Sequence, residues 1–82
     1  MTTDINMTTG YYEHYLCIDG EVIYSFDGFW FGDDPRACAE MSVESILSEF
    51  RENYNQNSYD LVSENKDEII KVMTEYIADW IV

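Results

Sequence analysis

The chain has 82 residues, of which 17 are Asp or Glu and only 4 are Lys or Arg, and its formal net charge is −13 at pH 7. A chain of this length forms one small domain, close to the size at which a single core is only marginally stable. The acidic excess argues against direct binding to nucleic acid, because affinity for phosphates comes from clustered Lys and Arg. The N-terminal residues have neither a basic region nor an apolar run, and no stretch reaches the length needed to span a membrane. We therefore expect a cytoplasmic protein that binds neither nucleic acid nor membranes.

The first third of the chain predicts a sheet. Residues 1–9 are polar and rich in Thr, and we expect a loose N-terminal tail there. The pairs Asp19-Gly20 and Asp27-Gly28 then separate runs of β-branched and aromatic residues. Asp-Gly between such runs favours a type I′ hairpin turn. The pattern predicts an antiparallel three-stranded meander over residues 10–32, with strands near 10–18, 21–26 and 29–32.

Two-residue turns set the expected register, which pairs Cys17 with Val22 and Leu16 with Ile23. Side chains alternate between the faces of a strand. One face is therefore predicted as a core layer: Tyr11, Tyr15, Cys17, Val22, Tyr24, Phe26, Phe29 and Phe31. The opposite face carries the apolar residues Tyr12, Leu16, Ile18, Ile23 and Trp30. A one-residue bulge would exchange these faces locally.

Two helices are predicted after the sheet. Asp34 is a suitable N-cap and Pro35 suits the first helical turn, which favours a helix over residues 35–53. Residues 53–58 read as a connection, and residues 59–62 as either a short helical turn or the start of the last helix. Asn65 followed by Glu68 is a capping-box arrangement, which predicts a helix over residues 66–81. The expected fold is α+β, with the order β-β-β-α-α in a single domain over residues 1–82.

No motif in the chain predicts catalysis. His14 is the only histidine, and no nucleophile elbow, phosphate loop or zinc-type spacing is present. Cys17 and Cys38 are expected to be reduced, buried thiols. We expect no enzyme activity, no cofactor and no metal.

The carboxylates of the predicted first helix form a row. Glu40 and Glu44 lie one turn apart, Glu52 continues the row and Glu49 lies beside it, with little expected relief from nearby cations. An ordinary solvated surface is one interpretation. The other is phosphate mimicry, in which carboxylates on a rigid helix occupy a basic groove that normally holds DNA or RNA. The predicted partner-binding acids are Asp33, Asp34, Glu40, Glu44, Glu49, Glu52, Asp60, Glu64, Asp67 and Glu68.

In size, charge and lack of catalytic residues, the whole chain resembles the small acidic inhibitors of phages and mobile elements, such as DNA-mimic anti-CRISPR and anti-restriction proteins. The resemblance implies a basic nucleic-acid-binding protein or ribonucleoprotein as partner, for example a CRISPR effector or a restriction enzyme. It also implies action in the host cytoplasm if the chain is phage-encoded. No motif supports it, so it assigns no residue.

A second resemblance lies in the order of the elements: strands come first, then Gly-Asp-Asp-Pro at 32–35, then a helix. This order is similar to that of the partly degraded RNase-H-like domain of HicB-type antitoxins. The Pro-Asp-Leu-Pro-Gly segment typical of that family is absent, and this chain has Phe-Asp-Gly-Phe-Trp at 26–30. The alternative function is therefore a structural or regulatory binding module, such as an antitoxin or an assembly subunit. It would bind its partner, or a second copy of the chain, through an apolar sheet face. The residues predicted for that face are Tyr12, Leu16, Ile23 and Trp30.

Overall fold

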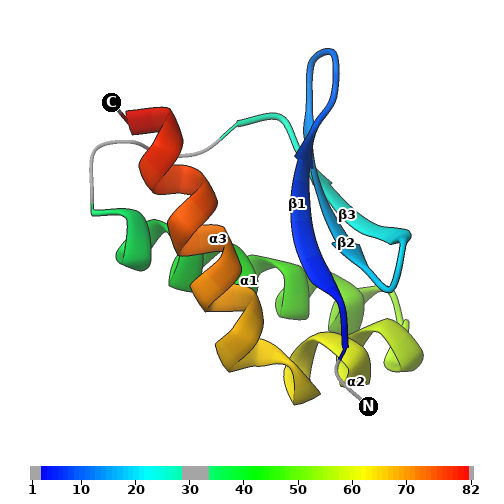
Figure 1. The fold of residues 1–82 in the computed structure, drawn as a ribbon. Coiled ribbons are helices and arrows are strands. Elements are labelled where there is room, and N and C mark those ends of the chain that lie inside the picture. The colour runs from blue at the N-terminus through cyan, green and yellow to red at the C-terminus, as the bar shows by residue number, and fades with distance from the viewer. Residues whose placement is uncertain (1–2, 29–33, 82) are drawn as a thin grey trace.

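The computed structural model describes residues 3–28 and 34–81 (Figure 1). An antiparallel sheet of order β1-β2-β3 precedes the helices, which confirms the predicted α+β meander. Three helices follow where two were predicted. The predicted strand at 29–32 lies outside the described residues. The elements are β1 (Ile5–Thr9), β2 (His14–Ile18), β3 (Glu21–Phe26), α1 (Pro35–Glu52), α2 (Gln56–Glu64) and α3 (Lys66–Ile81).

The N-terminal segment is a strand and not a loose tail. Residues 5–9 form β1, which pairs with β2 along its whole length, from Ile5 opposite Ile18 to Thr9 opposite His14. The predicted strand over 10–18 was therefore wrong in its first residues, because residues 10–13 form the β1–β2 turn. Burial explains the strand: Ile5 and Met7 alternate with polar residues and pack on the core, and the polar residues between them are exposed.

The hairpin predicted at Asp19-Gly20 is present. Asp19 and Gly20 have φ values of 51° and 85°, the positive values that a type I′ turn requires at both positions. The predicted pairing holds for Cys17 with Val22 and then shifts, so that Leu16 lies opposite Tyr24. This irregularity places Ile23 between two paired residues, as in a β-bulge.

The bulge mixes the two predicted faces of the sheet, because Leu16 and Ile18 pack on the core together with Tyr24 and Phe26, which were predicted on the opposite face. Leu16 has 0% of its surface exposed and packs in the core, whereas Val22, predicted to be buried, is 60% exposed. Tyr24 pairs with Leu16 and packs against the core. The predicted core layer is therefore wrong for Val22 and for Tyr11, which is 89% exposed, and right for Tyr24 and Phe26, which pack against the core.

Capping residues set the helix bounds. Asp34 accepts a hydrogen bond from the Ala37 N–H at 3.0 Å, and α1 ends at Glu52, within one residue of the predicted end. The segment predicted as a connection contains the start of α2, where the Asn55 side chain accepts from the Ser58 N–H at 3.3 Å. Tyr59 to Val62 belong to this separate helix. The last helix, α3, has the predicted bounds, but not the predicted cap, because the Asn65 amide donates to the Leu61 carbonyl of α2 at 2.8 Å.

The core lies between α1, α3 and one face of the sheet. Figure 1 shows α1 and α3 packed together on one side of the sheet, with α2 linking them at one end. The buried apolar side chains of this core come from β2 and from all three helices: Leu16, Ile18, Cys38, Ala39, Val43, Ile46, Leu47, Phe50, Val62, Ile69, Ile70, Met73 and Ile77.

The opposite burial of Leu16 and Val22 can be tested with a pair of variants. Leu16→Ala should lower the free energy of unfolding by about 2–5 kcal/mol, because it leaves a cavity in a fully buried site. Val22→Ala should change it by less than about 1 kcal/mol, because that side chain is largely solvated. Urea unfolding of both variants measures the difference. A larger effect at Val22 than at Leu16 would contradict the described sheet.

Candidate partner-binding surface

Carboxylates from three helices gather around a single lysine. The Lys66 ammonium at the start of α3 lies 2.6 Å from a Glu44 carboxylate oxygen of α1. Both residues line a hollow of about 460 Å³ together with Glu40 of α1, the exposed Met41, Ser45 and Ile70. The ion pair therefore joins the acidic face of α1 to the start of α3.

A second hollow continues this surface around the α2–α3 junction. It has a volume of about 440 Å³ and is lined by Glu64 at the end of α2, Asp67 and Glu68 in the first turn of α3, and Lys66. All three carboxylates are exposed. We call the five acids Glu40, Glu44, Glu64, Asp67 and Glu68 the acidic corner. Its carboxylates come from both segments in which the sequence predicted partner-binding acids.

The acidic corner keeps its lysine charged. The hydrogen bond to Glu44 raises the pKa of the Lys66 ammonium, and the charges of Glu44 and Asp67 act in the same direction. Lys66 therefore remains a cation and offsets part of the repulsion between α1 and α3, which leaves the corner with a net negative charge.

Several of the predicted acids, including Glu40 of the acidic corner, have partners elsewhere in the fold. Glu40 pairs with Arg36 one turn earlier at 3.0 Å. The prediction that nearby cations do little to offset the repulsion between the carboxylates of this helix therefore holds only in part. Asp34 is occupied as the α1 N-cap, and Asp60 accepts from the Gln56 amide at 2.7 Å. Glu52 is exposed at the end of α1. Asp33 lies outside the described residues.

Glu49 has a structural partner. The Tyr24 hydroxyl of β3 donates to the Glu49 carboxylate of α1, which links the sheet to the helix. This hydrogen bond is the main cause that raises the pKa of Tyr24 to about 12, followed by burial and by the Glu49 charge. Glu49 thus holds α1 against the sheet, a role that competes with partner binding.

The predicted apolar sheet face is not a surface in this fold. Leu16 is buried, and Ile23 is half-buried against the core, so the proposal that they contact a partner is wrong for Leu16. Tyr12 is 80% exposed, but in the β1–β2 turn, where its ring meets the Tyr11 ring edge to face. Trp30 lies outside the described residues. The three described residues, Tyr12, Leu16 and Ile23, do not form the single exposed patch that the sequence suggested.

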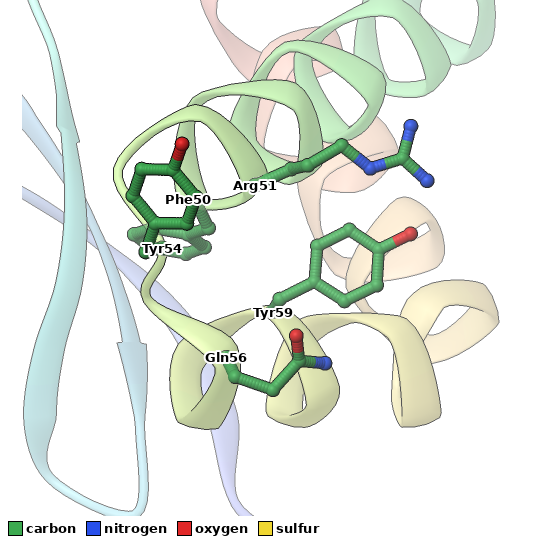
Figure 2. Close-up of a pocket in the computed structure, with 5 residues that line it drawn as sticks. All are labelled: Phe50, Arg51, Tyr54, Gln56 and Tyr59. Carbon is green, nitrogen blue, oxygen red and sulfur yellow. The ribbon is translucent and has the colours of Figure 1, made fainter.

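Sequence reasoning missed a pocket where α1 meets α2 (Figure 2). It has a volume of about 450 Å³ and is lined by Phe50 and Arg51 of α1, Tyr54 in the link, and Gln56 and Tyr59 of α2. The Arg51 guanidinium lies 5.8 Å from the centre of the Tyr59 ring. The sequence predicts a polar connection over residues 53–58, and only the helical turn after Asn55 brings Tyr59 to face Arg51.

A smaller hollow of about 300 Å³ connects this pocket to the acidic corner. It is lined by Leu47, Ser48, Arg51 and Tyr59, and it includes Glu44 of the corner. Because Arg51 and Tyr59 line both hollows, one continuous surface runs from Lys66 to Tyr54 along α1.

Several other polar and thiol groups within residues 3–28 and 34–81 are buried or hydrogen-bonded inside the fold. Cys17 and Cys38 are buried and unbridged, as predicted. The Tyr76 hydroxyl lies 2.6 Å from His14 Nδ1 and 2.6 Å from the Thr9 hydroxyl, which ties α3 to the β1–β2 hairpin. Across this part of the chain, no group of three or more His, Cys, Asp or Glu side chains could hold a metal ion. None of its helices has the length and apolar character needed to cross a membrane.

Comparison with known proteins finds no matching family model, no matching curated protein and no matching solved structure. The candidate site therefore rests on its own geometry.

The Tyr24–Glu49 link should make stability depend on alkaline pH. The folded protein favours the neutral phenol, so the unfolded chain loses this proton first, near its ordinary pKa of 10.0. The resulting stabilisation is complete below pH 10 and should be lost as the pH rises towards about 12. Urea unfolding of the native chain and of Tyr24→Phe measures it, since the other tyrosines titrate in both. A difference between the two proteins that stays constant over this pH range would contradict the link.

Proposed function

We propose that this protein is a small acidic inhibitor that binds a basic, nucleic-acid-binding surface by phosphate mimicry. The partner would be a protein or ribonucleoprotein of a bacterial defence complex, such as a CRISPR effector or a restriction enzyme, in the host cytoplasm. The protein would act by occupying the site of DNA or RNA and not by catalysis.

The observation that carries the proposal is the acidic corner. Its five carboxylates come from α1, α2 and α3. Among the described residues, Lys66 pairs with Glu44 and Arg36 with Glu40, and Glu64, Asp67 and Glu68 form no ion pair. Glu40 and Glu44 lie one helical turn apart, a rise of about 6 Å along the axis. The packing of α1 on α3 fixes the helices that carry these carboxylates. A fixed array of negative charge loses little conformational freedom when it meets a basic groove.

The whole-chain charge supports the same function. A net charge of −13 on so small a protein creates a field that steers a basic partner and speeds association. Such binding weakens with added salt, because ions screen charges separated by more than about 8–10 Å. An ordinary solvated surface predicts no partner with this salt dependence.

The experiment is a pull-down from bacterial lysate, with bound proteins eluted across a salt gradient and challenged with duplex DNA. The native chain should recover a basic nucleic-acid-binding protein that moderate salt releases and DNA displaces. The variant E40Q/E44Q/E64Q removes three corner charges and keeps side-chain shape. Its affinity for the recovered partner should fall by about tenfold or more.

The matched control is E21Q/D27N/D79N, which changes the net charge equally at exposed positions outside the corner. It should weaken binding much less. An equal loss of affinity in both variants would show that the net charge of the chain drives binding and that the acidic corner is not a specific site. A partner that survives high salt and ignores DNA would favour the structural or regulatory module instead.

A further inference from the structure

Tyr54 has a backbone conformation that its side chain disfavours. Its φ is 55°, in the left-handed region that residues other than glycine adopt at a cost. The Tyr54 N–H donates to the Arg51 carbonyl at 3.2 Å, and the Asn55 N–H donates to the Phe50 carbonyl at 2.9 Å. These two bonds form the Schellman motif that ends α1, in which the left-handed position is usually glycine. A tyrosine here is therefore worse for helix termination than the usual residue.

Packing does not explain the tyrosine either. Tyr54 is 93% exposed, so its ring contributes little to the core. Figure 2 shows Tyr54 among the side chains that line the α1–α2 pocket. Strained residues that stay exposed at a pocket are candidates for a role in binding.

Arg51 gives the pocket a second unusual feature. Among the described residues, its guanidinium pairs with no carboxylate, although the chain is rich in acids. It lies instead over the Tyr59 ring. The pocket thus offers a planar cation, two tyrosine rings and an amide on a surface that continues into the acidic corner.

We propose that this pocket receives an aromatic side chain of the basic partner, of the kind on which nucleic-acid bases stack. The inference rests on the proposed function. Proteins that bind single strands combine a basic groove with exposed aromatic rings. A mimic that supplies only carboxylates leaves those rings in water. Here the Arg51 guanidinium and the rings of Tyr54 and Tyr59 stand in for bases, since guanidinium and aromatic groups both stack on aromatic faces.

The test uses two capped lysine-rich peptides, one with a central tryptophan and one with alanine in its place. Their binding to the ¹⁵N-labelled chain is followed by NMR, with tryptophan fluorescence as a second readout. The tryptophan peptide should bind more tightly and shift the amide signals of residues 50–59. Tyr54→Gly should raise the thermal unfolding temperature, because glycine suits the left-handed position. The same variant should lower the affinity for the tryptophan peptide by about fivefold or more and leave the affinity for the alanine peptide unchanged.

Tyr11→Ala is the matched control, because Tyr11 is an equally exposed tyrosine in the β1–β2 turn. It should leave both affinities unchanged. Equal binding of the two peptides, or an unchanged affinity in Tyr54→Gly, would overturn the pocket proposal. If the affinity of both peptides then falls in E40Q/E44Q/E64Q, binding by the acidic corner is supported and only the role of the pocket is contradicted. If neither peptide binds, the pocket proposal is also contradicted. The pull-down with DNA competition then tests the proposed function independently.

Discussion

The packing of α1 against α3 is the contact on which the rest of the molecule depends. Carboxylates of a chain with net charge −13 repel one another, and this repulsion opposes compaction. Burial of Val43 and Ile46 of α1 with Ile69 and Met73 of α3 supplies apolar contact that opposes it. The same contact directs the charged faces of both helices outward. It therefore creates the acidic corner while it stabilises the fold.

Two of the four cations of the chain form ion pairs with acids of α1. Arg36 pairs with Glu40 within α1, and Lys66 joins α3 to Glu44 of α1. Exposed ion pairs of this kind contribute little stability each. Their larger effect is on the distribution of negative charge. They neutralise Glu40 and Glu44 in part, and the acids Glu64, Asp67 and Glu68, which form no ion pair with another described residue, remain together at the α2–α3 junction. Arg51 stands apart from this scheme over the Tyr59 ring.

Local signals predicted the parts of the fold that local chemistry determines. The Asp19-Gly20 turn and the start of α1 follow from turn and cap residues. The bounds of α3 were also predicted, but the Asn65 amide, expected to cap α3, donates to the Leu61 carbonyl of α2 instead. β1 was missed because Ile5 and Met7 become informative only once β2 pairs beside them. The shift opposite Leu16 has no sequence marker, and it places Leu16 and Tyr24, which were predicted on opposite faces, as a pair packed on the core. The acids of the corner were named from sequence, but their meeting around Lys66 requires the tertiary contact of α1 with α3.

The most direct test of the account maps the bound surface. The ¹⁵N-labelled chain is titrated with the DNA-displaceable partner, and amide signals that shift or broaden are located on the structure. We expect them to centre on Glu44, Lys66 and Asp67 and to extend along α1 to Tyr54. Changes centred on the exposed sheet residues Val22 and Ser25, with the acidic corner unaffected, would contradict phosphate mimicry by this surface.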